Sequence, residues 1–130
     1  MELQTAMLCE AATVRDGLLY ILGGGVSCCS APQYPIQLQV SLAVMIELDY
    51  LDQGEAHKFV VTLLDAEARE LGRGEGEFAT LQELDLDAVA TLPAVIPLAG
   101  MTLPVAGDYE IRLEIDGDTR SRLPFHSRTC

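Results

Sequence analysis

The chain has 130 residues, enough for a single domain that buries about two-thirds of the surface of its unfolded state. Twenty Asp and Glu residues against eight Lys and Arg residues give a formal net charge of -12. This charge argues against nucleic acid and anionic membranes as partners, because both are polyanions. No apolar stretch approaches the length of about 20 residues that spans a bilayer, so we expect no membrane insertion.

The N-terminal segment and the cysteines bear on location. The segment MELQTAMLCE has neither a basic region nor an unbroken apolar stretch, so it does not predict a signal peptide. The expected location is therefore the cytoplasm, where Cys9, Cys28, Cys29 and Cys130 would be free thiols rather than a disulfide framework.

Short strands follow one another along the chain. The clearest lies between Gln37 and Leu48, where apolar residues alternate with mostly polar ones at the period of a half-buried strand. Asp-Gly pairs at positions 16–17 and 116–117 predict tight hairpin turns. The predicted strands are Leu3–Val14, Leu18–Leu22, Gln37–Leu48, Phe59–Leu64, Leu71–Phe78, Pro93–Leu98, Tyr109–Asp116 and Thr119–His126.

The first predicted hairpin is apolar on both faces. Its two faces are expected to carry Leu3, Met7 and Cys9 on one side, and Ala6, Leu8 and Val14 on the other. A strand that is apolar on both faces is usually covered on both faces.

One segment, Thr80–Ala90, is a candidate for a short helix. Thr80 and Glu83 match a capping box, and Leu81, Leu84 and Ala88 would share one face.

Short strands with turn signals every 8–12 residues or so predict a single domain over residues 1–130. The expected fold is all-β: an antiparallel immunoglobulin-like sandwich of about seven or eight strands, with at most one short helix. The sequence Ala106-Gly107-Asp108-Tyr109 allows two interpretations of the tyrosine. Its hydroxyl could bond back to an upstream backbone group as a tyrosine corner, or Tyr109 could be an ordinary inward residue.

The segment from Leu8 to Val26, LCEAATVRDGLLYILGGGV, resembles the opening of a family of uncharacterised bacterial proteins that is common in actinobacteria and other GC-rich bacteria. Further similarity lies in Pro32 to Pro35, Val40 to Leu48, Gly107 to Tyr109, Asp116-Gly117 and Leu123-Pro124-Phe125. The resemblance covers most of the chain. It implies no known activity and no catalytic residue.

No motif predicts catalysis, so we expect a protein that is not an enzyme and needs no cofactor. The chain has no Gly-x-Ser-x-Gly elbow and no Cys-x-x-Cys pair. The triplet Gly23-Gly24-Gly25 is interpreted as a strand-end turn, because Pro32 and Pro35 exclude the helix that a phosphate loop requires.

Aspartates in three predicted loops form the candidate metal site. Some β-sandwiches bind Ca²⁺ with loop carboxylates, because this hard cation takes about six to eight oxygen ligands. Solvated turns are also commonly acidic, so the pattern has two interpretations. The candidate ligands are Asp49, Asp52, Asp85, Asp87, Asp116 and Asp118.

The function that we expect is a non-catalytic protein-interaction or structural module that forms a homo-oligomer. The apolar fraction slightly exceeds the needs of one core, and sandwich edges are natural pairing sites. Candidate interface residues are Leu3, Met7, Ala43 and Met45, which could instead belong to the core of the monomer. The alternative function is a calcium-dependent binding module that uses the aspartate loops.

Overall fold

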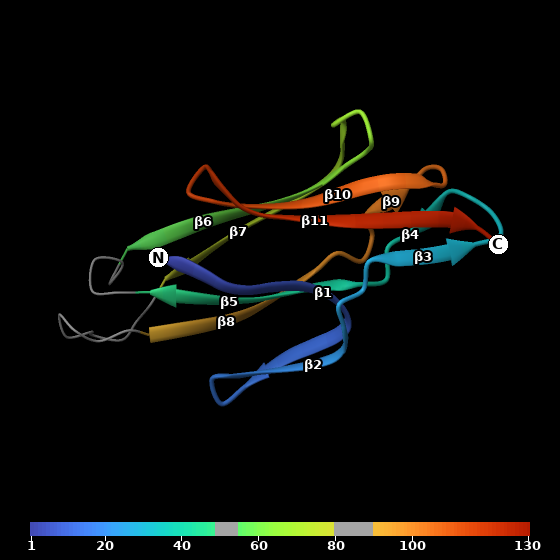
Figure 1. The fold of residues 1–130 in the computed structure, drawn as a ribbon. Helices are drawn as coiled ribbons and strands as arrows, with labels where there is room; N and C mark the ends of the chain where they lie inside the picture. The colour runs from blue at the N-terminus through green and yellow to red at the C-terminus, as the bar shows by residue number, and fades with distance from the viewer. Residues whose placement is uncertain (49–54, 80–89) are drawn as a thin grey trace.

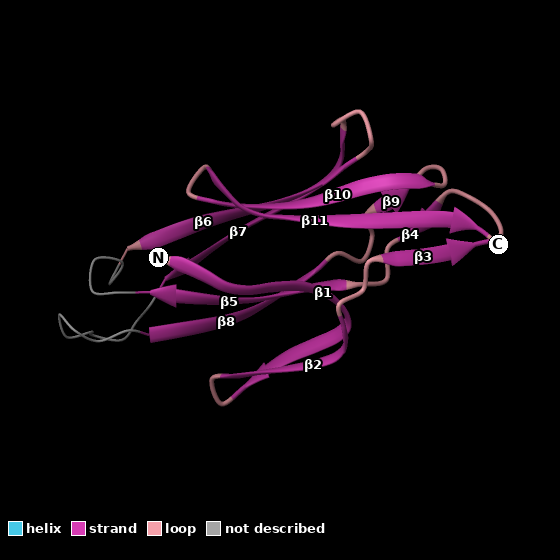
Figure 2. Ribbon diagram, in the orientation of Figure 1, coloured by secondary structure: helices cyan, strands magenta, loops and turns pink. Residues whose placement is uncertain are grey.

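The computed structural model describes residues 1–48, 55–79 and 90–130, and every regular element in them is a strand (Figures 1 and 2). The strands are β1 (Glu2–Arg15), β2 (Leu18–Gly24), β3 (Cys28–Ala31), β4 (Ile36–Gln37), β5 (Ser41–Leu48), β6 (Ala56–Leu64), β7 (Glu70–Ala79), β8 (Ala90–Pro97), β9 (Thr102–Leu103), β10 (Gly107–Ile115) and β11 (Asp118–Thr129). The all-β prediction is confirmed. Of the helix candidate, residues 80–89 lie outside the described part, and Ala90 begins β8.

Two sheets face each other, with a two-stranded pair beside them (Figure 1). Sheet A has the order β2-β1-β5-β8, sheet B has the order β3-β11-β10-β6-β7, and β4 pairs with β9. All neighbours are antiparallel except β3 and β11, which run parallel. The core cluster between the sheets consists of Leu8, Leu38, Leu42, Val44, Ile46, Leu48, Val61, Leu63, Leu98, Leu103, Tyr109, Ile111, Leu113, Ile115 and Phe125.

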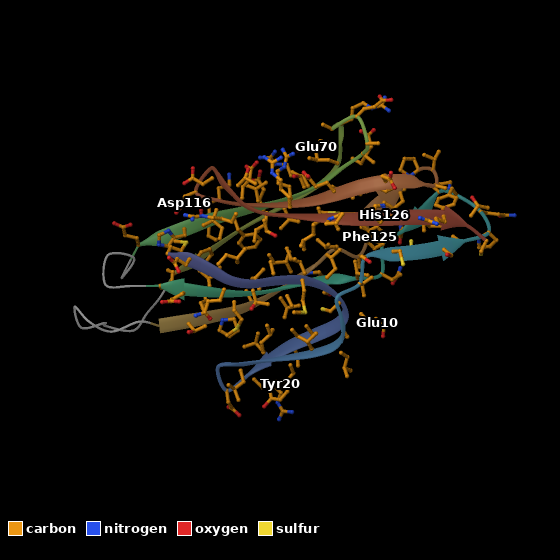
Figure 3. The ribbon with its side chains drawn as sticks, in the orientation of Figure 1. Glu10, Tyr20, Glu70, Asp116, Phe125 and His126 are labelled. Carbon is orange, nitrogen blue, oxygen red and sulfur yellow. The ribbon has the colours of Figure 1, made fainter. Side chains whose placement is uncertain are left out.

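Alternation along β5 and β10 explains how this core is filled. Leu42, Val44, Ile46 and Leu48 on β5 belong to the core cluster, as do the alternate residues from Tyr109 to Ile115 on β10. Successive side chains of a strand point to opposite faces, so one apolar residue in two is enough to cover one face of each sheet. Phe125, with no exposed surface, lies between the two layers (Figure 3).

The strand count exceeds the prediction of seven or eight, because the described residues contain eleven strands. The three additional strands are β3, β4 and β9, each of two to four residues. Segments this short show no periodicity, and they are strands only because partners distant in sequence pair with them. For example, Cys28 on β3 lies beside His126 on β11.

An irregularity in β1 changes the predicted faces of the first hairpin. The pairing register with β5 shifts between Leu3 and Thr5. Leu3 therefore packs against the core cluster together with Ala6 and Leu8, instead of sharing a face with Met7. A bulge inverts the alternation of every residue before it, which a strict period of two cannot anticipate.

The predicted turns are confirmed. Asp16 and Gly17 have φ values of 52° and 74°, and Asp116 and Gly117 have values of 52° and 85°. Two successive residues with positive φ are typical of the type I′ turn that joins two strands directly. The hydroxyl of Tyr109 donates a hydrogen bond to the backbone oxygen of Val105, so the tyrosine-corner interpretation is also confirmed.

The described part of the chain contains no helix that is long and apolar enough to span a membrane.

Candidate functional site

Two of the six candidate calcium ligands, Asp116 and Asp118, lie in the turn between β10 and β11, while Asp49, Asp52, Asp85 and Asp87 lie outside the described residues. Asp116 already serves two partners. Its Oδ2 is 2.6 Å from Nδ1 of the buried His57, and its Oδ1 accepts the Lys58 backbone N–H at 3.0 Å. The hydrogen bond with His57, followed by that from Lys58, lowers the pKa of Asp116.

Four strand ends lie at this end of the molecule. Leu48 of β5 pairs with Ala90 of β8, and Ala56 of β6 pairs with Ala79 of β7. They lie at the same end of the sandwich as the turn that carries Asp116, with the β5 and β8 ends in the opposite sheet (Figures 1 and 3). In the part of the chain that is described, no group of three or more His, Cys, Asp or Glu side chains is placed to hold a metal ion.

A thiol, an imidazole and a carboxylate lie on neighbouring strands, in register, across one end of sheet B. Cys28 on β3 pairs with His126 on β11, which pairs with Asp108 on β10, and the His126 Nδ1–Asp108 Oδ1 distance is 2.7 Å. Cys28 and Asp108 are exposed. Among the described residues, no hydrogen bond joins the Cys28 thiol to the imidazole.

The other thiols of the described strands have structural surroundings. The Cys9 thiol is buried, which raises its pKa, and it donates to the Ser41 backbone oxygen at 3.5 Å. The Cys29 Sγ lies 3.2 Å from the Ser127 Oγ, which lies 2.6 Å from the Tyr34 hydroxyl. These contacts fix the end of β11 against β3 and the following loop.

A hollow of about 540 Å³ lies between the β6–β7 turn and the loop that precedes β10. The carboxylate of Asp65 on its wall accepts the backbone N–H groups of Glu67 and Arg69, each at 2.9 Å, and the Arg69 Nε at 2.9 Å. The hydrogen bond from the Arg69 backbone is the largest cause of the lowered pKa of Asp65. This carboxylate orders its own turn and is poorly suited to general-base work, which needs a pKa near the operating pH.

The outward face of sheet B is covered by paired charges. Arg112 contacts Glu110 at 2.8 Å, and Arg73 contacts Glu75 at 2.7 Å and Glu70 at 3.2 Å. Thr62 lies in register between Arg112 and Arg73 and is only 7% exposed. The aliphatic stems of these arginines therefore screen the β6 strand from water while their charged groups remain at the surface.

The outward face of sheet A is different, because it carries almost no charge. By alternation with the core residues, its positions on the three paired strands are Glu2, Thr5, Met7, Cys9, Ser41, Ala43, Met45, Glu47, Thr91, Pro93, Val95 and Pro97. Of these only Glu2 and Glu47 are charged; they lie opposite each other at one end of the face, and Glu47 accepts a hydrogen bond from the Gln4 amide at 2.8 Å.

The four predicted interface residues separate into two groups. Leu3 packs against the core and Ala43 has no exposed surface, so neither is available to a partner in the folded single chain. Met7 and Met45 are half-buried on the outward face of sheet A, outside the core cluster. Participation of these two methionines in an interface stays a prediction.

Large exposed apolar side chains gather on β2, within the hairpin that the sequence singled out but outside the four predicted interface residues. Leu18, Tyr20 and Leu22 are 59%, 51% and 72% exposed, and they alternate on one face of the hairpin. The hairpin of β1 and β2 projects from the sandwich, and Tyr20 lies on it far from Phe125 in the core (Figures 1 and 3). A signal was present in the sequence, because residues 17–46 contain no Asp, Glu, Lys or Arg.

The edges of the two sheets differ in how they are protected from pairing. β8 carries Pro93 and Pro97, which lack a backbone donor, and β7 carries charged residues such as Arg73 and Glu75. β3 has only four residues. β2 pairs only with β1, and its sequence LLYILGG has neither a charge nor a proline. Among the four outer strands β2, β3, β7 and β8, β2 is therefore the longest that has neither prolines nor charges to discourage pairing.

The model of a family of unknown function, DUF6941, matches residues 4–128, so the chain belongs to this family. A search of curated proteins found no significant match to the chain.

Proposed function

We propose, for a chain whose family has no assigned activity, that the protein is a non-catalytic interaction module that associates with a second copy of itself through the β1–β2 hairpin. The observation that carries the proposal is β2, an unprotected sheet edge with Leu18, Tyr20 and Leu22 exposed on one face. Unpaired strand edges are templates for pairing with another chain.

The exposed side chains supply a driving force. Burying an apolar side chain of this size contributes about 1.5–3 kcal/mol, against an association cost of roughly 4–15 kcal/mol. Three such side chains from each of two copies therefore support a weak to moderate complex rather than a permanent one. A hollow of about 400 Å³ on the same hairpin, lined by uncharged residues such as Ala12 and Ile21, adds apolar surface.

The distribution of charge favours binding of a second copy at the hairpin over binding at other surfaces. Two molecules of net charge -12 repel each other, so they can approach only where the surface is charge-poor. The hairpin meets this condition, since between positions 3 and 26 only Glu10, Arg15 and Asp16 are charged. A two-fold axis would make one such surface self-complementary.

Light scattering over a range of concentrations tests the proposal. The wild type should approach twice the monomer mass of 14.1 kDa as concentration rises. A Leu18→Ser/Leu22→Ser variant should stay at the monomer mass, because it removes apolar surface without touching the core. Val105→Ser is the matched control, since Val105 is 61% exposed but lies in another loop.

Two results contradict the proposal. One is a wild-type protein that stays monomeric at the highest concentration at which the solution shows no precipitate. The other is a double-serine variant that associates as strongly as the wild type. Equal melting temperatures of all three proteins would show that association, and not folding, is being compared.

We also propose a fold class, a cellular compartment and a type of source organism. Facing antiparallel sheets and the Tyr109 corner support an immunoglobulin-like sandwich. The four free cysteines support a reducing compartment such as the cytoplasm, and the resemblance of residues 8–26 supports a bacterial source.

The alternative is a calcium-dependent binding module. It is supported by the turn of Asp116 and Asp118 lying at the end where the strands before and after the other acidic loops meet. The two existing partners of Asp116 weigh against it. Thermal unfolding with calcium and with chelator distinguishes the two, because a ligand that binds only the folded state raises stability by RT ln(1 + [L]/Kd).

A further inference from the structure

We infer that two copies pair β2 against β2, edge to edge and antiparallel, about a two-fold axis at Tyr20. Sheet A then continues from one copy into the other, and assembly stops at the dimer. This inference rests on the proposed self-association and specifies its geometry.

The hydrogen-bonding pattern of the hairpin identifies the free backbone groups of β2. The type I′ turn at Asp16-Gly17 is closed by Arg15 and Leu18, which form a hydrogen-bonded pair. Hydrogen-bonded and non-hydrogen-bonded pairs then alternate, so Leu18, Tyr20 and Leu22 direct their N–H and C=O groups toward β1. The N–H and C=O groups of Leu19 and Ile21 point to the open edge.

The regular part of the strand fixes the centre of the pairing. Gly23 has a φ of +63°, which leaves the extended region, so the regular edge runs from Leu18 to Leu22. The middle residue of this stretch is Tyr20. In an antiparallel pair centred there, Leu19 of each copy bonds Ile21 of the other, and both available donors and acceptors on each strand are used.

The side chains match in the same register. Leu18 of one copy lies opposite Leu22 of the other, and the two Tyr20 side chains lie opposite each other. All six belong to the exposed apolar row of the hairpin, and no like charges meet across the pair. The two Tyr20 residues form a non-hydrogen-bonded pair, in which Cα atoms approach to about 4.5 Å.

Closure at two copies follows from the two-fold axis. Once β2 is paired, the outer strands β8, β7 and β3 stay free, as does the other side of β1 beyond Cys9, where β1 pairs with β2 alone. Pro93 and Pro97, the charges of β7 and the short length of β3 each discourage further pairing. Because a two-fold axis uses the same β2 edge of both copies, this interface closes at two copies and does not extend into a filament.

Cross-linking tests the register. Tyr20→Cys places one thiol of each copy beside the axis, and the Cα separation of about 4.5 Å in this pair lies within the range of about 4.4–6.8 Å that a disulfide spans. Mild oxidation should convert this variant to a covalent dimer to an extent well above that of the wild type. The wild-type level measures the cross-linking that Cys28, Cys29 and Cys130 cause by themselves. Thr13→Cys is the matched control, since Thr13 is exposed on the same face and pairs with Tyr20 one strand away from the edge.

Charge substitution tests the edge independently. Tyr20→Lys places two ammonium groups opposite each other and should weaken the dimer at least about tenfold. Thr13→Lys adds the same charge to the same face and should change the dissociation constant by less than about threefold.

The outcomes separate this inference from the proposed function. A monomeric wild type refutes both. A dimeric wild type in which Thr13→Lys weakens association as much as Tyr20→Lys refutes edge pairing and indicates packing of the hairpin faces. A dimeric wild type whose Tyr20→Cys variant gives no excess cross-link refutes the Tyr20 axis, while self-association through the hairpin stands.

Discussion

Replacement of glycine by alanine should have opposite effects on stability at two positions of β7. Gly76 pairs with Phe59 on β6, and a methyl group at Gly76 would lie 2.6 Å from Phe59 Cε1 and in contact with Cζ. Phe59 packs against the core cluster, so its ring must move to admit the methyl group. Gly74 lies two residues earlier, and a methyl group there would meet nothing within 4 Å. Neither glycine has a positive φ.

The magnitudes follow from these contacts. Gly74→Ala should raise the free energy of unfolding by about 0.5–1 kcal/mol, because alanine reduces the entropy of the unfolded chain. Gly76→Ala has the same gain, but overpacking costs about 1–3 kcal/mol. The two variants should therefore differ by about 2 kcal/mol. In a chain of 130 residues this corresponds to roughly 8 °C in melting temperature.

Thermal and denaturant unfolding of the two variants and the wild type provides the assay. A second measurement adds Phe59→Leu to each alanine variant. The smaller side chain should remove most of the penalty at Gly76 and leave the effect at Gly74 unchanged, which is a coupling energy of about 1–2 kcal/mol. If the two alanine variants melt at the same temperature, the ring of Phe59 does not pack on Gly76 and the reasoning is wrong.

Three further substitutions test turns and corners by unfolding measurements. Tyr109→Phe removes the hydroxyl of the tyrosine corner and should cost about 1 kcal/mol, seen as a fall of about 4 °C in melting temperature. Ala68→Gly should stabilise by about 0.5–1 kcal/mol, because Ala68 has a φ of 61°, whereas Ala66→Gly in the same turn should destabilise. Asp65, whose pKa is lowered chiefly by the Arg69 backbone N–H, stabilises the fold above its unfolded pKa and loses this effect as pH falls through its folded pKa. The stability difference between wild type and Asp65→Asn should therefore shrink as pH falls from about 5 to about 2 in denaturant titrations, and a constant difference would contradict the role assigned to this carboxylate.

The candidate site shows where sequence reasoning ended. The first hairpin was predicted to be apolar on both faces, which pointed toward an interface. The particular residues could not be chosen, because exposure depends on what lies over each face. Ala43 lies among neighbours that leave it no exposed surface, whereas Leu22 on the projecting hairpin is 72% exposed. Both are ordinary apolar residues in alternating strands.

The sequence by itself determined the all-β class, the two Asp-Gly turns and the longer strands. These features depend on interactions between residues near in sequence, namely period-two alternation and the conformations open to Asp-Gly. Only the tertiary structure decided the short strands β3, β4 and β9, the register shift after Leu3 and the position of β2 at a sheet edge. Each of these depends on pairing between segments distant in the chain, and neither local propensity nor composition specifies which segments meet.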